Sequence, residues 1–178
     1  LTAEAATSWA TQVGYTTDQW SVSAIANYKF NGWSDEYYHS LGHSPDPSCT
    51  TCNFTAIGLR SWWRPTETGT AVPSVSLGYD TTSYGVGTAT AASDTSSAWF
   101  AGLTWQDTFL ADDRIGIAFG MPTKNEDETV DPFAYELYYS FKANDSVTVT
   151  PAVFGGSDRN GTSGQDIFGA VLQTEFKF

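Results

Sequence analysis

Hydrophobic and polar residues alternate one by one through much of this chain. In Gln19–Phe30, apolar residues occupy the even positions from Trp20 to Phe30, and polar residues occupy most of the odd ones. Successive strand side chains point to opposite faces, so this period of two predicts strands with one apolar face. Nine segments follow the pattern, and none shows a helical period: Ala6–Tyr15, Gln19–Phe30, Phe54–Trp63, Pro73–Asp80, Ser97–Gln106, Arg114–Met121, Phe133–Phe141, Ser146–Phe154 and Asp166–Phe178.

The connections between these segments alternate in length. The shorter ones are Thr16–Asp18, Arg64–Val72, Asp107–Asp113 and Lys142–Asp145. The longer ones are Asn31–Asn53, Thr81–Ser96, Pro122–Pro132 and Gly155–Gln165. Short turns at one end and long loops at the other are typical of an up-and-down outer-membrane barrel, whereas a β-sandwich has no reason to keep that rhythm.

Aromatic residues make up 15% of the chain, yet its mean hydropathy is only −0.27. Most of the rings on the apolar parity lie near strand ends, as the interfacial girdles of a membrane barrel do. The closing segment also ends on an aromatic residue, Phe178. We therefore predict an all-β fold, an antiparallel transmembrane β-barrel. The alternative is a β-sandwich whose core the rings fill.

Nine is an odd number of strands, whereas bacterial barrels close with an even number. An unpaired edge in lipid would leave backbone groups without partners. The sequence also shows no basic and apolar leader before Leu1. Either a strand is miscounted or the chain is part of a larger barrel. We expect the second, with residues 1–178 as the C-terminal part of one larger barrel domain and the earlier strands and any periplasmic domain outside this chain.

The formal net charge is −12, which argues against nucleic-acid binding and favours cationic solutes. Charged residues on the polar parity are candidates for the lining of a pore, where such side chains set ion preference. They are Lys29, Arg60, Arg114, Glu136, Glu175 and Lys177. The longer loops are acidic, most densely at Glu126, Asp127, Glu128 and Asp131. These carboxylates could concentrate cations at the pore mouth or form an ordinary solvated surface.

No combination of residues suggests catalysis, so we expect neither an enzyme nor a cofactor. Cys49 and Cys52 form a single close pair in a Ser/Thr/Pro-rich loop, which favours a local disulfide. Half of a metal or redox site is the alternative, with His39 and His43 nearby. We expect no metal there, because the loop lacks a helical pattern that would align the histidines.

Several segments resemble a known family. The ending L-Q-T-E-F-K-F is similar to the closing strand of bacterial porins. The segments F-T-A-I-G-L-R-S-W-W-R-P, S-A-W-F-A-G-L-T-W-Q-D and F-A-Y-E-L-Y-Y-S-F-K-A-N-D-S-V-T-V-T-P-A-V-F resemble the barrel of cyanobacterial major outer-membrane porins. That group belongs to the carbohydrate-selective porin family and includes iron-uptake porins. The turn K-A-N-D-S-V-T-V-T-P is the most specific of these motifs.

This resemblance implies a sixteen-stranded type of barrel, often trimeric, that passes small solutes or inorganic ions. It also implies a periplasmic domain that binds peptidoglycan, which we expect to lie outside residues 1–178. We therefore expect an outer-membrane porin that allows passive diffusion of small hydrophilic solutes or ions and contacts outer-membrane lipid. The alternatives are a non-conducting structural or adhesive barrel, and a secreted glycan-binding β-sandwich.

Overall fold

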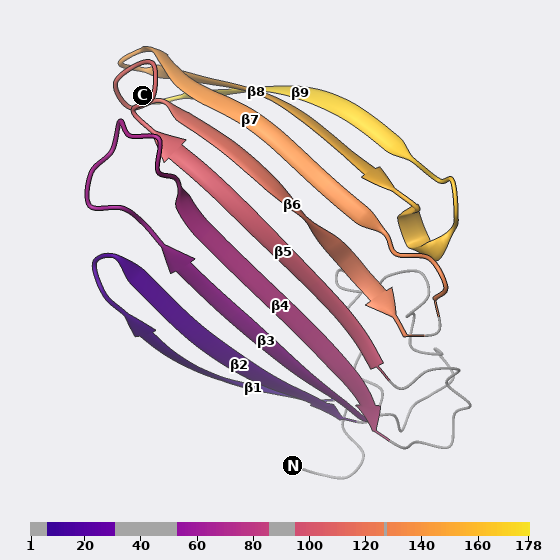
Figure 1. The fold of residues 1–178 in the computed structure, drawn as a ribbon. Coiled ribbons are helices and arrows are strands. Elements are labelled where there is room, and N and C mark those ends of the chain that lie inside the picture. The colour runs from indigo at the N-terminus through magenta and orange to yellow at the C-terminus, as the bar shows by residue number, and fades with distance from the viewer. Residues whose placement is uncertain (1–6, 31–52, 86–94, 127) are drawn as a thin grey trace.

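The computed structural model describes residues 7–30, 53–85, 95–126 and 128–178. These residues form one nine-stranded antiparallel sheet, and each strand pairs only with its neighbours in sequence (Figure 1). The strands are β1 (Thr7–Thr16), β2 (Trp20–Phe30), β3 (Asn53–Trp63), β4 (Ser74–Gly85), β5 (Thr95–Gln106), β6 (Arg114–Asn125), β7 (Phe133–Asn144), β8 (Val147–Ser157) and β9 (Ile167–Phe176). A 3-10 turn, η2 (Arg159–Gly161), precedes β9.

The nine predicted strands and the all-β class are confirmed, with differences at the strand ends. The largest difference is in β4, which was predicted to stop at Asp80 and continues to Gly85. Hydrophobic alternation ends at Asp80 because hydroxyl residues then occupy both faces. Threonine nevertheless fits a pleated backbone well, so the ladder with β3 continues through Ser83 to Gly85.

The connections lie at two opposite ends of the sheet. The turns after β1, β3, β5 and β7 lie at one end, where the chain also finishes, and we call this the turn end (Figure 1). The opposite end, which we call the loop end, carries the connections after β2, β4, β6 and β8. The connections at the turn end range from Asp145–Ser146 to Arg64–Pro73. The predicted alternation of length therefore holds only in part: β4 and β6 extend beyond their predicted ends, so the connections that follow them are no longer than those after β3 and β5.

The cross-strand register defines an apolar face that runs over all nine strands. For example, Ala24 of β2 opposes Leu59 of β3, which opposes Tyr79 of β4. The register continues this face to Leu137 in β7 and Leu172 in β9. Leu137 is 44% exposed and Leu172 is 68% exposed, and among the described residues Ala152 is the only buried hydrophobic one. No second layer of described residues therefore covers the apolar face.

Aromatic side chains of the apolar face contact one another in two separate zones. At the turn end, Tyr15 and Trp20 have ring centroids 5.4 Å apart, and Tyr139 stacks on Phe141 at the same distance. At the loop end, ring contacts join Trp9 to Tyr28, Trp99 to Phe119, and Phe119 to Phe133. Between the zones lie smaller side chains such as Ala24, Ile117, Leu137 and Val153. The face therefore has an aliphatic band between two aromatic borders.

Among the described residues, no helix is long and apolar enough to cross a membrane.

Candidate functional site

The opposite, polar face of the sheet carries most of the charged residues of the strands. The register places these charges on it: Lys29, Arg60, Asp80, Arg114, Glu136, Lys142 and Glu175. Lys124 cannot be assigned to a face by the same register, because a register shift between β5 and β6 precedes it. It lies opposite Ser97, at the loop end. Its ammonium group binds the carboxylate of Asp131 there. The central part of the apolar face therefore has no charged side chain.

The six residues predicted to line a pore are spread along this polar face. Lys29 lies at the loop end of β2, and Arg114 begins β6 at the turn end. Lys177 follows β9, and its backbone amide donates to the carbonyl of Ser146 at 2.8 Å. Arg60 and Glu136 lie in the middle of β3 and β7. The six side chains thus share a surface but do not form one cluster.

Arg60 has a partner that the sequence did not indicate. Its Nη2 lies 2.7 Å from Oδ2 of Asp80, and both side chains are close to half exposed. Nη1 donates to the carbonyl oxygens of Leu59 at 2.8 Å and Tyr79 at 3.2 Å. The guanidinium carbon also lies 5.4 Å from the ring centroid of Phe100, a cation–π distance. Four groups therefore hold this arginine against the wall of the sheet.

Asp80 was placed at the boundary between a strand and an acidic loop in the sequence prediction, so its pairing was missed. The signal that could have found it is its parity, because Ser74, Ser76, Gly78 and Asp80 all occupy the polar side of β4. Continuing the strand through the following threonines would have put Asp80 on the same face as Arg60.

Three aromatic rings lie flat on the polar face, each against a glycine directly across from it. The pairs are Phe100 with Gly78, Tyr138 with Gly116, and Phe154 with Gly169. A Cβ atom added to these glycines would come within 2.1, 2.0 and 2.4 Å of ring carbons. The missing side chains therefore let the rings lie against the backbone of the neighbouring strand.

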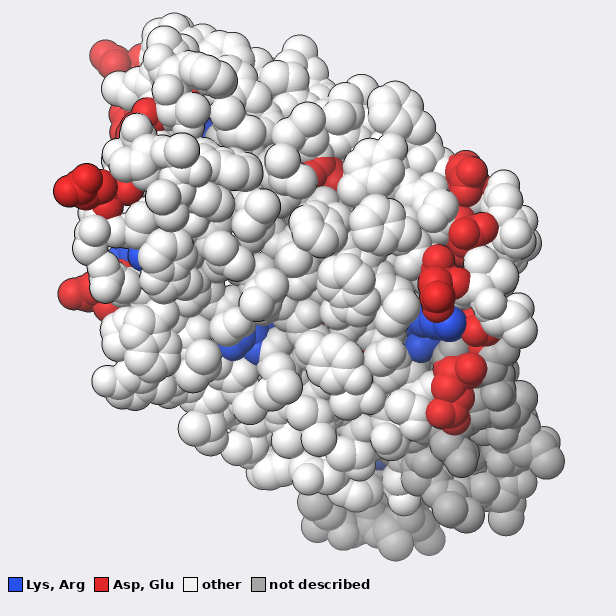
Figure 2. Space-filling view, in the orientation of Figure 1, with Lys and Arg blue, Asp and Glu red and all other residues white. Residues whose placement is uncertain are grey.

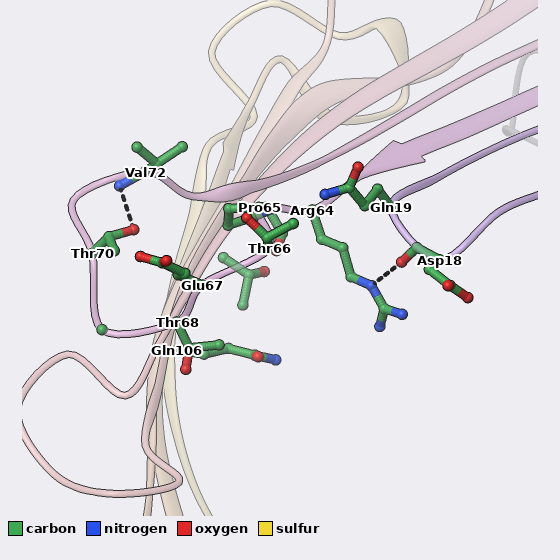
Figure 3. Close-up of a pocket in the computed structure, with 13 residues that line it drawn as sticks. Asp18, Gln19, Arg64, Pro65, Thr66, Glu67, Thr68, Thr70, Val72 and Gln106 are labelled. Atoms are coloured by element: carbon green, nitrogen blue, oxygen red, sulfur yellow. Dashed lines mark hydrogen bonds between the residues drawn. The ribbon is translucent and has the colours of Figure 1, made fainter.

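A hollow of about 370 Å³ lies on the polar face at the turn end (Figure 3). Its lining is largely polar and includes Gln19, Arg64, Thr66, Glu67, Thr104 and Gln106. The Nε of Arg64 donates to the backbone oxygen of Asp18 at 2.6 Å, which ties the connection after β3 to the turn between β1 and β2. This hydrogen bond thus links two of the connections that line the hollow.

The turn between β5 and β6 is organised around a buried carboxylate. Asp113 accepts backbone hydrogen bonds from Thr108 at 2.7 Å, Phe109 at 3.0 Å and Leu110 at 2.9 Å. The hydroxyl of Tyr139 donates to it as well, at 3.0 Å. Burial raises the pKa of Asp113, but these hydrogen bonds outweigh burial and hold the pKa below its ordinary value. This turn fixes the start of β6 and hence the position of Arg114.

Acidic residues border both ends of the sheet. In Figure 2, Asp and Glu side chains gather along two opposite edges of the molecule, and the wide area between them carries few charges. Of the residues assigned to an acidic outer loop by sequence, Glu126 and Asp131 are exposed at the loop end, and Glu128 is partly buried there. Asp127, Cys49, Cys52, His39 and His43 lie outside the described residues. Within the described part of the chain, no three His, Cys, Asp or Glu side chains come together as a metal-binding group.

No protein-family model, curated protein or solved structure matches this chain.

Proposed function

We propose that this chain forms part of the wall of an outer-membrane porin, through which small hydrophilic solutes or inorganic ions diffuse passively. The observation that carries the proposal is the apolar face of the nine-stranded sheet. Its large side chains are exposed, no described residue covers them, and no charge interrupts its centre. Soluble proteins rarely expose large contiguous apolar patches, so an apolar face that runs over nine strands supports a surrounding of lipid.

The dimensions of the sheet support a lipid environment. The strands contain 10 to 12 residues. With a rise of about 3.3 Å per residue and a tilt near 40°, such strands span roughly 25–30 Å, close to the hydrocarbon core of a bilayer. The two zones of ring contacts border this band, where amphipathic aromatic side chains favour the interface between lipid and water.

Strand direction supports a larger barrel. In an antiparallel sheet of nine strands in sequence order, β1 and β9 run in the same direction. The two edges cannot pair antiparallel with each other, and open edges are costly in lipid. We therefore propose that β1–β9 are the C-terminal strands of a barrel to which an odd number of further strands contributes. The sixteen-stranded, trimeric form implied by the porin resemblance is one solution.

The polar face would then line the water-filled lumen. Its strand charges, its hydroxyl groups and the polar hollow at the turn end all suit contact with water. A charged side chain in the lumen avoids the cost of roughly 2–4 kcal/mol that Arg or Lys incurs at the lipid face near mid-membrane. Solutes would cross by diffusion, without turnover and without a cofactor.

Recordings in planar lipid bilayers test this function. The purified full-length protein should produce discrete, ohmic current steps in potassium chloride. A protein that inserts into the bilayer but produces no steps would be a plugged, non-conducting barrel, and the porin proposal would be wrong. A protein that dissolves as a monomer without detergent would contradict the membrane assignment itself, as expected for a secreted β-sandwich.

A further inference from the structure

We propose that the described wall makes the pore prefer cations, with Glu136 as the selectivity-determining charge at mid-sheet and Asp80 as the residue that neutralises Arg60. This inference rests on the proposed pore function and specifies the class of solute that the pore favours. It depends on which charges of the polar face are paired and which are not.

Arg60 is the cation nearest the middle of the described polar face, and its charge is compensated. Asp80 lies on the neighbouring strand and makes a direct ion pair with it. Because both side chains are nearly half exposed, the stabilisation that this pair gives the fold is small. The pair matters more for a passing ion. A positive and a negative charge 2.7 Å apart largely cancel at the distance of a hydrated ion, so Arg60 repels a cation in the lumen only weakly.

The surrounding residues fix the pair in place. A Cβ atom on Gly58 would lie 2.7 Å from Oδ1 of Asp80, so this carboxylate occupies space that only glycine leaves free. On the other side, Gly78 makes room for Phe100, whose ring lies under the guanidinium group. Two glycines and one ring thus keep Arg60 and Asp80 against the wall instead of letting either charge extend into the lumen.

Glu136 has the opposite environment. It is exposed on the same face, and its direct cross-strand neighbours are Ala118 and Phe154. The next residues on its own side of β7 are Ala134 and Tyr138. No positively charged group pairs with it among the described residues. Its carboxylate is therefore an uncompensated negative charge in the middle of the sheet.

The other charges of the polar face lie near the two ends of the sheet, and Lys142 among them forms an ion pair. The ammonium of Lys142 lies 2.6 Å from the carboxylate of Asp112, and Arg114 lies in the field of Asp107. Lys29 lies at the loop end, where Glu126 and Asp131 are also exposed. With the formal net charge of −12, the field of the chain favours cations at both mouths as well as at mid-height.

Reversal potentials in a potassium chloride gradient measure this preference. For the wild-type full-length protein we expect a potassium-to-chloride permeability ratio above one. Glu136→Gln should lower the ratio by roughly twofold or more, since it removes the uncompensated charge. Asp80→Asn should lower it as well, because it exposes the positive charge of Arg60. Asp145→Asn removes the same charge from the turn after β7, outside the strands, and should lower the ratio much less than Glu136→Gln does.

A double variant distinguishes neutralisation of Arg60 by Asp80 from a general disturbance of the fold by Asp80→Asn. Adding Arg60→Gln to Asp80→Asn removes both charges of the pair and should restore the wild-type ratio. Failure of this rescue, or a ratio unaffected by Glu136→Gln, would overturn the inference while the porin function stands. A wild-type preference for chloride would overturn it too. Absence of any current steps would instead reject the proposed function.

Discussion

Gly78 of β4 and Phe100 of β5 are direct cross-strand partners, and the ring of Phe100 occupies the space of the missing glycine side chain. A Cβ atom on Gly78 would lie 2.1 Å from Cε1 of the ring, far inside van der Waals contact. The same ring carries the guanidinium group of Arg60. One glycine thus determines where an aromatic ring and a cation lie on the neighbouring strands.

Gly78→Ala should destabilise the protein, because Phe100 must leave its position and its contact with Arg60 is lost. Overpacking of this kind costs about 1–3 kcal/mol. Gly102→Ala is the matched control on the same face, since its added Cβ would find Ser76 Cβ at 3.8 Å, an ordinary contact. Urea unfolding in lipid vesicles should separate the two variants, and equal midpoints would contradict the tight fit of Phe100 on Gly78.

Leu137→Arg should impair assembly into a bilayer far more than Glu136→Arg or Glu136→Gln. Leu137 lies in the middle of the apolar face between Ile117 and Val153. An arginine that faces lipid there should cost roughly 2–4 kcal/mol. Glu136 is the adjacent residue and points to the polar face. The protease-resistant fraction after reconstitution into vesicles measures assembly. Similar fractions for arginine at both positions would argue against different surroundings for the two faces.

Two single-cysteine variants should react with different reagents. Leu172→Cys lies on the apolar face of β9 and Gln173→Cys on the polar face, in a protein whose Cys49 and Cys52 are replaced by serine. A lipid-soluble thiol reagent should label position 172 and a charged, membrane-impermeant one should label position 173. Each reagent should label its own position clearly more than the other position, because lipid-facing and lumen-facing residues alternate along a barrel strand. Labelling of both positions by the charged reagent would place both faces in water.

The turn between β5 and β6 should open when Asp113 is neutralised. The folded-state pKa of Asp113 lies below its ordinary value of 3.8, so the carboxylate contributes stability that is fully present above that pH. As the pH falls through the lower, folded-state pKa, this contribution is lost. In Asp113→Ala the amides of Thr108, Phe109 and Leu110 lose their acceptor at every pH.

Hydrogen exchange of these three amides provides the measurement. At neutral pH we expect exchange on the order of tenfold faster in Asp113→Ala than in the wild type. Asp112→Asn is the control, because the side chain of Asp112 is exposed and binds Lys142 instead of backbone amides, and asparagine tolerates the φ of 63° at this position. Unchanged exchange in the Asp113 variant would show that the backbone alone holds this turn.

Much of the fold could be read from the sequence because the signal is local. A strand with one face in an apolar surrounding must alternate, and every strand here pairs with its neighbour in sequence. The strand ends were less predictable, since residues such as Thr82 and Ser83 continue the ladder without any apolar alternation. At those residues, backbone pairing with β3 extends the strand. Because no apolar side chains alternate there, the sequence carries no pattern from which the extension could be predicted.

The candidate site was predicted only in part. Parity placed Arg60, Arg114 and Glu136 on one face, because it depends only on position along a strand. Parity could not show that Asp80 neutralises Arg60, because that contact depends on the register between β3 and β4. The buried role of Asp113 was likewise hidden, since its donors come from the backbone of the turn and from Tyr139 of another strand.

Because the strands of the sheet follow one another in sequence order, the sheet is a row of consecutive hairpins. Each hairpin contacts only the hairpins on either side, so removing or inserting one would leave the register of the remaining strands intact. With neighbouring strands about 4.8 Å apart, one hairpin changes the width of the sheet, and hence the circumference of the proposed barrel, by about 10 Å. Gain or loss of one hairpin during evolution would thus suffice to widen or narrow the proposed barrel, while the residues of the polar face on the other strands stayed the same.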